Sequence, residues 1–178
     1  ISFGGTPPSF LYDENDLATP SVITISPEVD LEMLRSTAQE DEELWGEAPF
    51  IAPAIDVEFS LSEAGEWTTL DDGSRICRMQ IEAEGAAALL FSYRSFDMPE
   101  GSSLYIYNAN RSHLTGAYTS QSNPSGRAFS TEMVTGDQVI LEYVSASEEM
   151  PRIVIDKVGY CFQDSPQKIG ESGDCMVN

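Results

Sequence analysis

Alternation of apolar and polar residues begins near residue 54 and recurs almost to the end of the chain. Over residues 54–61, the run Ala-Ile-Asp-Val-Glu-Phe-Ser-Leu alternates as expected of a strand with one buried face. Segments 67–70 and 75–81 flank an Asp-Asp-Gly-Ser sequence and predict a β-hairpin. The apolar face of the second hairpin strand is expected to hold Ile76, Met79 or Cys77, and Ile81, and its register stays open.

Further strand-like runs follow at fairly regular spacing, separated by turns that contain Gly, Pro, Asn or Asp. The run 87–93 is dense in apolar residues, which indicates a strand covered on both faces. The other runs are 21–25, 104–107, 114–118, 128–133, 138–144 and 152–162. This pattern predicts an all-β fold, a jelly-roll-like antiparallel β-sandwich.

One helix is predicted before the sandwich and outside it. Ser26, Pro27 and Glu28 supply an N-cap hydroxyl, a first-turn proline and a first-turn acid. Apolar residues then continue at roughly helical spacing, which predicts a helix over 27–39. Residues 1–20 have Gly and Pro punctuation without a clear period, so we expect an extended arm able to lie along a partner.

These patterns divide the chain into three parts. Residues 1–50 form an arm and an acidic helix, residues 51–163 form the β-sandwich, and residues 164–178 form a polar linker. The linker contains Lys168, and the only other lysine, Lys157, falls in a predicted strand. A lysine in a segment rich in Ser, Pro, Gly and Gln is easy for a protease to reach, because such a segment can be extended without breaking packed structure.

Charge and composition narrow the range of partners. The chain has 30 acidic against 9 basic residues and a net charge of −21, which repels phosphate backbones and argues against nucleic acid. It contains no apolar run of about 18 residues, so we expect no membrane span. No basic segment followed by an apolar stretch opens the sequence, so we expect any signal peptide to have been removed already.

The sequence offers little catalytic chemistry. The single histidine, His113, lies in a turn-like segment and lacks the flanking signature of a hydrolytic triad. One histidine and three scattered cysteines make a poor zinc site. Residues 71–73 and 13–16 carry clustered carboxylates, but without the spacing of a calcium loop, so an ordinary Asp-Gly turn and a solvated arm are favoured. We expect no catalytic residue, metal or cofactor in this chain.

The three cysteines are an odd number, which in an exported protein suggests a partner outside the chain. Cys77 and Cys161 lie in strand-like runs, and Cys175 lies in the polar linker. Two interpretations stay open. In the first, Cys77 pairs with Cys161 and Cys175 pairs outside this fragment; in the second, Cys77 and Cys161 are buried free thiols.

Several blocks together resemble the N-terminal pro-region of secreted, lysyl endopeptidase-like (trypsin-like) serine proteases of Bacteroidetes-type bacteria. The tail Glu171-Ser172-Gly173-Asp174-Cys175 is similar to the opening of the mature protease in that family. The other blocks are Pro27 to Leu34, Gly65-Glu66-Trp67-Thr68 through Arg78, Leu89 to Tyr107 with Met98-Pro99-Glu100-Gly101, and Gly136 to Tyr143.

The resemblance implies a pro-domain that assists folding of the downstream protease domain and inhibits it until cleavage. Lys168 would precede the scissile bond, Ile169 would begin the released protease, and Cys175 would be the protease's first cysteine, pairing further downstream. The implied protein is a secreted or cell-surface monomer. Cys77 and Cys161 depart from the family pattern, so a disulfide between them would be peculiar to this chain.

Two other classes of protein fit the same β-rich pattern. An adhesin-like or carbohydrate-binding module would display an exposed aromatic surface, for which the candidates are Trp67, Tyr105, Tyr107 and Tyr118. Such residues are more often core or cross-strand pairs. The third class is a structural or interaction module of a larger surface protein.

Overall fold

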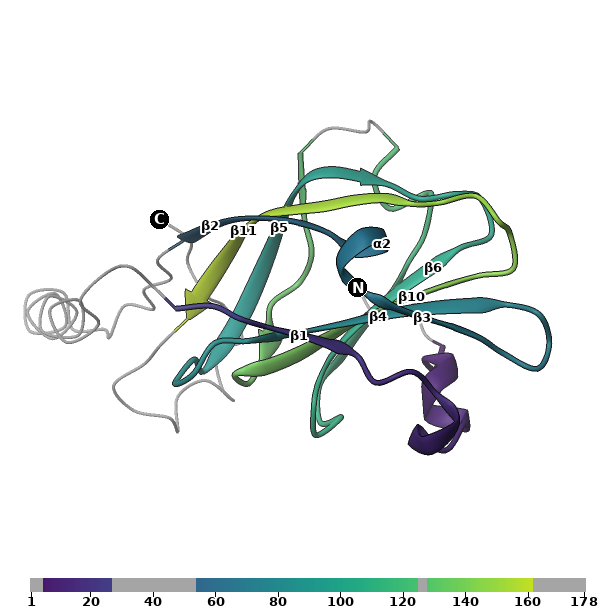
Figure 1. The fold of residues 1–178 in the computed structure, drawn as a ribbon. Coiled ribbons are helices and arrows are strands. Elements are labelled where there is room, and N and C mark those ends of the chain that lie inside the picture. Colours follow the sequence, from purple (N-terminus) through teal and green to yellow (C-terminus); the bar gives the residue numbers. More distant parts are fainter. Residues whose placement is uncertain (1–4, 27–53, 125–127, 162–178) are drawn as a thin grey trace, which may run out of the picture.

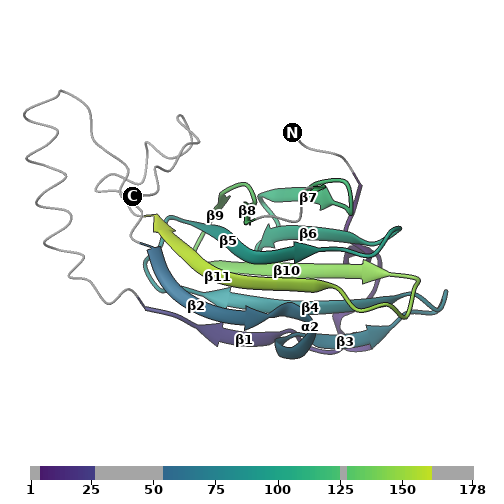
Figure 2. The same cartoon turned by 90° about the horizontal axis from the view of Figure 1, so that it is seen from above.

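The computed structural model describes residues 5–26, 54–124 and 128–161, and over these ranges the regular structure is mostly β-strand, with short helical turns. Two sheets lie face to face, as Figures 1 and 2 show from two directions. The predicted all-β fold is therefore confirmed. The predicted helix over 27–39 lies outside the described residues.

The first sheet, called sheet 1, has the strand order β1-β4-β10-β6-β7, and β3 also pairs with β4. Its pairs are antiparallel except for β1, which runs parallel to β4. β3 and β1 lie end to end along one edge of β4, opposite residues 75–78 and 79–82. The bounds are β1 Ser21–Thr24, β3 Glu66–Thr69, β4 Arg75–Glu82, β6 Ser103–Asn108, β7 Leu114–Tyr118 and β10 Gln138–Ser145.

The second sheet, sheet 2, is antiparallel and has the order β2-β11-β5-β8, with β9 also on β5. Its long central strands β5 and β11 shift register at two points, between Val154 and Ile155 and between Ile155 and Lys157. Such irregularities bend and twist a strand. The bounds are β2 Ala54–Ser60, β5 Ala88–Asp97, β8 Phe129–Ser130, β9 Val134–Thr135 and β11 Arg152–Cys161.

One apolar core fills the space between the sheets, because alternate residues of the strands point inward. Cys77, Met79 and Ile81 of β4 all face this core, whereas Ile76 faces the other side of sheet 1. The inward face therefore holds both Cys77 and Met79 together with Ile81, and the expectation that Ile76 shares this face is wrong. Sheet 2 contributes side chains that include Leu89, Phe91, Tyr93, Ile153, Ile155 and Val158.

The end of β2 departs from the predicted strand. Leu61 does not continue the strand but begins a single helical turn, α2 (Leu61–Ala64), and its side chain is fully buried. The Trp67 indole Nε1 donates to the Ser62 carbonyl at 3.0 Å, which ties this turn to β3. The predicted run 128–133 was also too long, because it holds only the two-residue strand β8, and the short β9 follows it.

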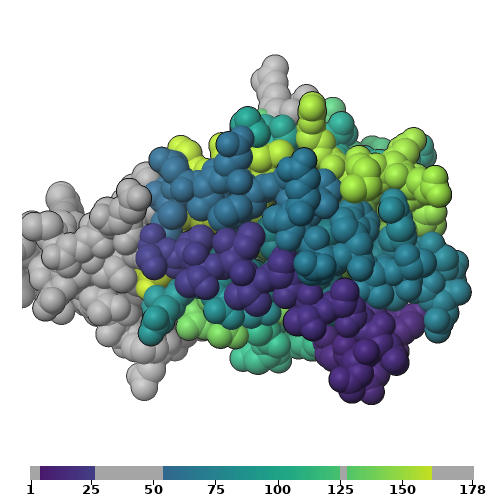
Figure 3. All heavy atoms as spheres, viewed as in Figure 1, coloured from purple at the N-terminus to yellow at the C-terminus, as the bar shows by residue number. Residues whose placement is uncertain are grey.

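The N-terminal segment covers the outer face of sheet 1. It forms two short 3-10 helices, η1 (Pro8–Leu11) and η2 (Glu14–Asp16), before it enters β1. Figure 1 shows these turns on the side of sheet 1 away from sheet 2, and Figure 3 shows the segment as a continuous band on the surface. The segment predicted to lie along a partner thus packs on its own chain, and the central strands β4, β10 and β6 are largely buried on both faces.

Candidate functional site

Only one of the two lysines of the sequence, Lys157, lies among the described residues. Lys157 lies in β11, the strand between β2 and β5, with Asp56 and Ser92 opposite it on the two neighbouring strands. Its side chain is exposed, but its backbone belongs to a strand paired on both sides. The predicted processing site, Lys168 and Ile169, lies outside the described residues, as does Cys175.

Neither interpretation of Cys77 and Cys161 holds in full, because the two are not bonded to each other and only Cys77 is a free thiol. Cys77 is a free thiol, fully buried in the core, and it donates to the Leu61 carbonyl oxygen at 3.3 Å. Cys161 is disulfide-bonded, and its partner is not among the described residues. The two cysteines belong to different apolar clusters, because Cys77 lies beneath α2 and Cys161 packs beside Ala88 at the end of β11.

The pKa of the Cys77 thiol is raised to about 12, first because burial disfavours the thiolate and second because Glu66 is nearby. A thiol in this state is a poor nucleophile and a poor metal ligand. Cys77 is therefore a packing residue in this fold.

His113 has a structural role in the turn between β6 and β7. Its ring Nδ1 accepts a hydrogen bond from the Thr135 backbone N–H at 3.1 Å, and its own backbone N–H donates to the Asn108 side chain at 3.0 Å. The Asn108 amide in turn donates to the Thr135 carbonyl at 3.0 Å. These bonds join the turn to the strand β9.

The acidic segments considered for calcium are local turns. The carboxylate of Asp72 accepts from the backbone N–H of Ser74 at 2.9 Å and from its hydroxyl, and that of Asp13 accepts from the Asn15 N–H at 3.0 Å. The side-chain and backbone bonds from Ser74 lower the pKa of Asp72. Within the described ranges, no group of three or more His, Cys, Asp or Glu residues is placed to hold a metal ion.

The aromatic residues proposed for a sugar-binding surface do not form one. Tyr105, Tyr107 and Tyr118 are buried. Trp67 is half-buried and packs edge to face on the core residue Tyr143, with ring centroids 6.0 Å apart. These aromatic residues are therefore core residues and cross-strand pairs, the alternative to a sugar-binding surface.

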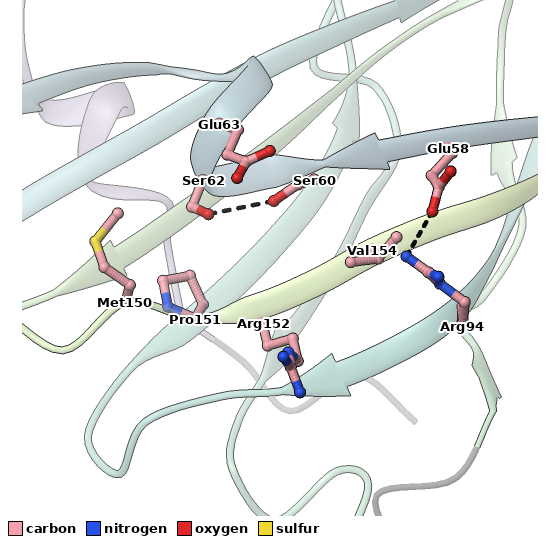
Figure 4. Close-up of a pocket in the computed structure, with 9 residues that line it drawn as sticks. All are labelled: Glu58, Ser60, Ser62, Glu63, Arg94, Met150, Pro151, Arg152 and Val154. Atoms are coloured by element: carbon pink, nitrogen blue, oxygen red, sulfur yellow. Dashed lines mark hydrogen bonds and ion pairs between the residues drawn. The ribbon is translucent and has the colours of Figure 1, made fainter.

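An open depression of about 530 Å³ lies on the outer face of sheet 2, beside α2. Figure 4 shows the Arg94 guanidinium of β5 directed at the Glu58 carboxylate of β2, at 2.6 Å. Both side chains are largely exposed, so water screens this pair. Arg152 and Glu63 also line the depression, which contains no histidine, cysteine or aromatic residue. It lacks the usual base for an acyl-transfer nucleophile and any ring on which a sugar could stack.

The most unusual side chains of the described structure lie beneath the N-terminal segment. Glu142 of β10 and Arg78 of β4 are opposite each other in register, and both are almost completely buried on the outer face of sheet 1. Charged groups are rarely buried unless they are paired and hydrogen-bonded. We call Glu142, Arg78 and the residues that satisfy them, Ser9, Glu14 and Tyr107, the arm cluster.

The Glu142 carboxylate is held from two directions. It accepts from the Ser9 backbone N–H at 3.0 Å, from the Ser9 hydroxyl, and from the Tyr107 hydroxyl at 2.7 Å. Burial first, and the Glu142 carboxylate second, raise the pKa of Tyr107 above its ordinary value, which keeps this phenol protonated and able to donate. Glu142 is thus satisfied partly by its own sheet and partly by the arm.

The Arg78 guanidinium is satisfied by the arm on its outer side. It donates to the two Glu14 carboxylate oxygens at 3.0 and 3.2 Å and to the Ala18 carbonyl at 2.7 Å. A second guanidinium, that of Arg111, reaches the same carboxylate at 3.3 Å. Sequence analysis missed this cluster, although a charged residue inside each of two strongly apolar strands was a visible signal.

The chain matches no protein-family model. Among the described residues, no helix is long and apolar enough to cross a membrane.

Proposed function

We propose that this chain is the pro-region of a secreted bacterial lysyl endopeptidase-like serine protease, with a jelly-roll-like body and a processing site after Lys168. In this proposal the body assists folding of the downstream protease domain. The linker occupies the active-site cleft as an extended strand, with Lys168 in the pocket that selects lysine. Cleavage turns an inhibitor tethered in the same chain into a separate molecule, which loses its high effective concentration.

The observation that supports this proposal is the position of Lys157. A protease needs its substrate as an extended strand in its own cleft. The backbone around Lys157 is in the interior of sheet 2, between β2 and β5, so it cannot enter a cleft without breaking that sheet. A lysine-specific enzyme would therefore spare the folded body and act at the other lysine of the sequence, Lys168.

Limited digestion with a lysine-specific endopeptidase tests the proposal. We expect one early cut, after Lys168, and a body that stays folded and inhibits the enzyme. Mass spectrometry of the products identifies the new termini, and inhibition is measured on a small chromogenic lysine substrate. The variant Lys168→Arg should lose the early cut, and the matched variant Lys157→Arg should keep it.

Early cleavage after Lys157, or a chain left intact at Lys168, would contradict the processing site. A correctly cut body that fails to inhibit the protease would contradict the inhibitory role.

A further inference from the structure

The N-terminal arm makes its contacts with sheet 1 in the manner of a bound peptide. Three residues of the segment 8–18 make these contacts. Ser9 donates a hydrogen bond to Glu142, the Phe10 ring packs against the Tyr107 ring, and Glu14 forms an ion pair with Arg78. The rings of Phe10 and Tyr107 meet edge to face with centroids 4.8 Å apart, and the Arg111 guanidinium covers Phe10 at 4.0 Å. Glu142 accepts from the backbone N–H and the hydroxyl of Ser9, Tyr107 packs against the Phe10 ring, and Arg78 pairs with the Glu14 carboxylate.

Charge complementarity sets this surface apart from the rest of the molecule. The chain carries −21 net and only 9 basic residues, yet two guanidinium groups converge on the single carboxylate of Glu14. Arg111, one of the two, is the only described residue other than glycine with a positive φ, 59°. The turn between β6 and β7 places this guanidinium against Phe10 and Glu14 of the arm.

The balance of polar and apolar contacts lowers the cost of releasing the arm. Its few apolar contacts include Leu17 against Leu70 and Ile76, and Phe10 against the Tyr107 cluster. Most of the remaining recognition comes from hydrogen bonds and ion pairs. When the arm leaves, water can solvate Arg78 and Glu142, which reduces the cost of opening compared with that of exposing an apolar face.

We propose that the outer face of sheet 1 is a binding groove for an acid-bearing segment of short 3-10 turns, and that it accepts the arm of a second copy of this chain. In the structure, residues 8–18 of the same chain occupy this groove. Every copy of the chain carries both the groove and that segment. Ala18 is the last arm residue that contacts Arg78, and Thr19 and Pro20 connect it to β1. A change in the backbone torsions of Thr19 and in the ψ of Pro20, whose ring fixes its φ, would redirect the arm to a neighbour without changing β1, as in domain swapping.

The test measures whether the full chain binds its own arm sequence when that sequence is added as a separate peptide. The probe is a fluorescent synthetic peptide of residues 5–20, and its binding is followed by anisotropy. The receptors are the wild-type chain, whose own arm competes, and the variant Glu14→Ala, whose groove is intact but whose arm lacks the carboxylate. We expect the variant to bind the peptide about tenfold more tightly than the wild type does, the scale of a hydrogen-bonded charge contact.

A peptide carrying Glu14→Ala is the matched control and should bind the variant about tenfold more weakly than the wild-type peptide does. Light scattering at rising concentration should show wild-type dimers that excess wild-type peptide dissociates. The proposal that the outer face of sheet 1 is a binding groove would be contradicted if the variant bound no peptide, or if the two peptides bound equally. Peptide binding by a chain that stays monomeric at all concentrations would overturn the second copy as occupant. Neither readout involves Lys168, so failure here is distinguishable from failure of the processing site.

Discussion

Residue Cys77 illustrates how burial decides the chemistry of a side chain. The sequence allows a disulfide or a free thiol at this position, and the fold selects the thiol because the side chain points between the sheets beneath α2. In that position the Leu61 carbonyl is its hydrogen-bond acceptor. Reactivity is then governed by access to water more than by the identity of the residue.

We predict that Cys77 resists alkylation in the folded protein. Its pKa of about 12 leaves the thiolate at pH about 8.5 roughly a thousandfold rarer than in an unperturbed cysteine. Iodoacetamide labelling at position 77, followed by peptide mass spectrometry, should be very slow under native conditions and fast in concentrated guanidinium chloride. The variant Cys77→Ser identifies the peptide that carries the label. Rapid native labelling would mean that the thiol is not buried.

At the scale of elements, the turn α2 connects the ends of β2 and β3 and closes one side of the core. Leu61 is the only residue of α2 that is fully buried, and it lies in the main apolar cluster. Gly65 follows, and a Cβ there would lie 2.8 Å from the Leu61 carbonyl oxygen, so the chain needs glycine for this close approach.

We predict that Leu61→Ala lowers the free energy of unfolding by about 2–5 kcal/mol, because it leaves a cavity between the sheets. The same substitution at Leu11, which is 79% exposed, should change it by less than about 0.5 kcal/mol. Urea denaturation of both variants measures the difference. Equal losses for the two leucines would show that α2 does not close the core.

The elements also show what the sequence could and could not predict. Long strands such as β2, β4 and β10 were predictable because alternation marks a buried face. β8 and β9 have two residues each, too few for any period to be visible. Arg78 and Glu142 alternate with the core residues, so the local pattern places them on the face of sheet 1 that points away from the core. Only the non-local packing of residues 8–18 buries them, and no local pattern encodes that packing.

Among the candidate site residues, the sequence correctly placed Lys157 in a strand but did not predict the state of the cysteines. The exclusion of Lys157 from a flexible segment followed from its place in an apolar run, and the paired strands around it confirm that placement. The disulfide prediction failed because sequence spacing carries no information on the direction of two Cβ atoms. The processing site after Lys168 stays a prediction, as it lies outside the described residues.

At the scale of the whole molecule, net charge opposes the compact state. A charge of −21 on 178 residues produces self-repulsion that is relieved when the chain expands, and dissolved salt screens it. The ion pair of Arg78 with Glu14 has the opposite dependence, because screening weakens attraction as well. The attraction acts between two groups in direct contact, whereas the repulsion acts between charges spread over the whole surface.

We therefore predict that added sodium chloride raises the thermal midpoint of unfolding, by a few degrees between about 0.01 M and about 1 M, where the Debye length falls from about 30 Å to about 3 Å. Differential scanning calorimetry measures the shift, and potassium chloride at equal ionic strength should give the same curve if screening is the cause. The variant Glu14→Ala should show a larger rise than the wild type, because it lacks the attraction that salt weakens. A midpoint that falls with salt in both chains would mean that short-range ion pairs outweigh the long-range repulsion.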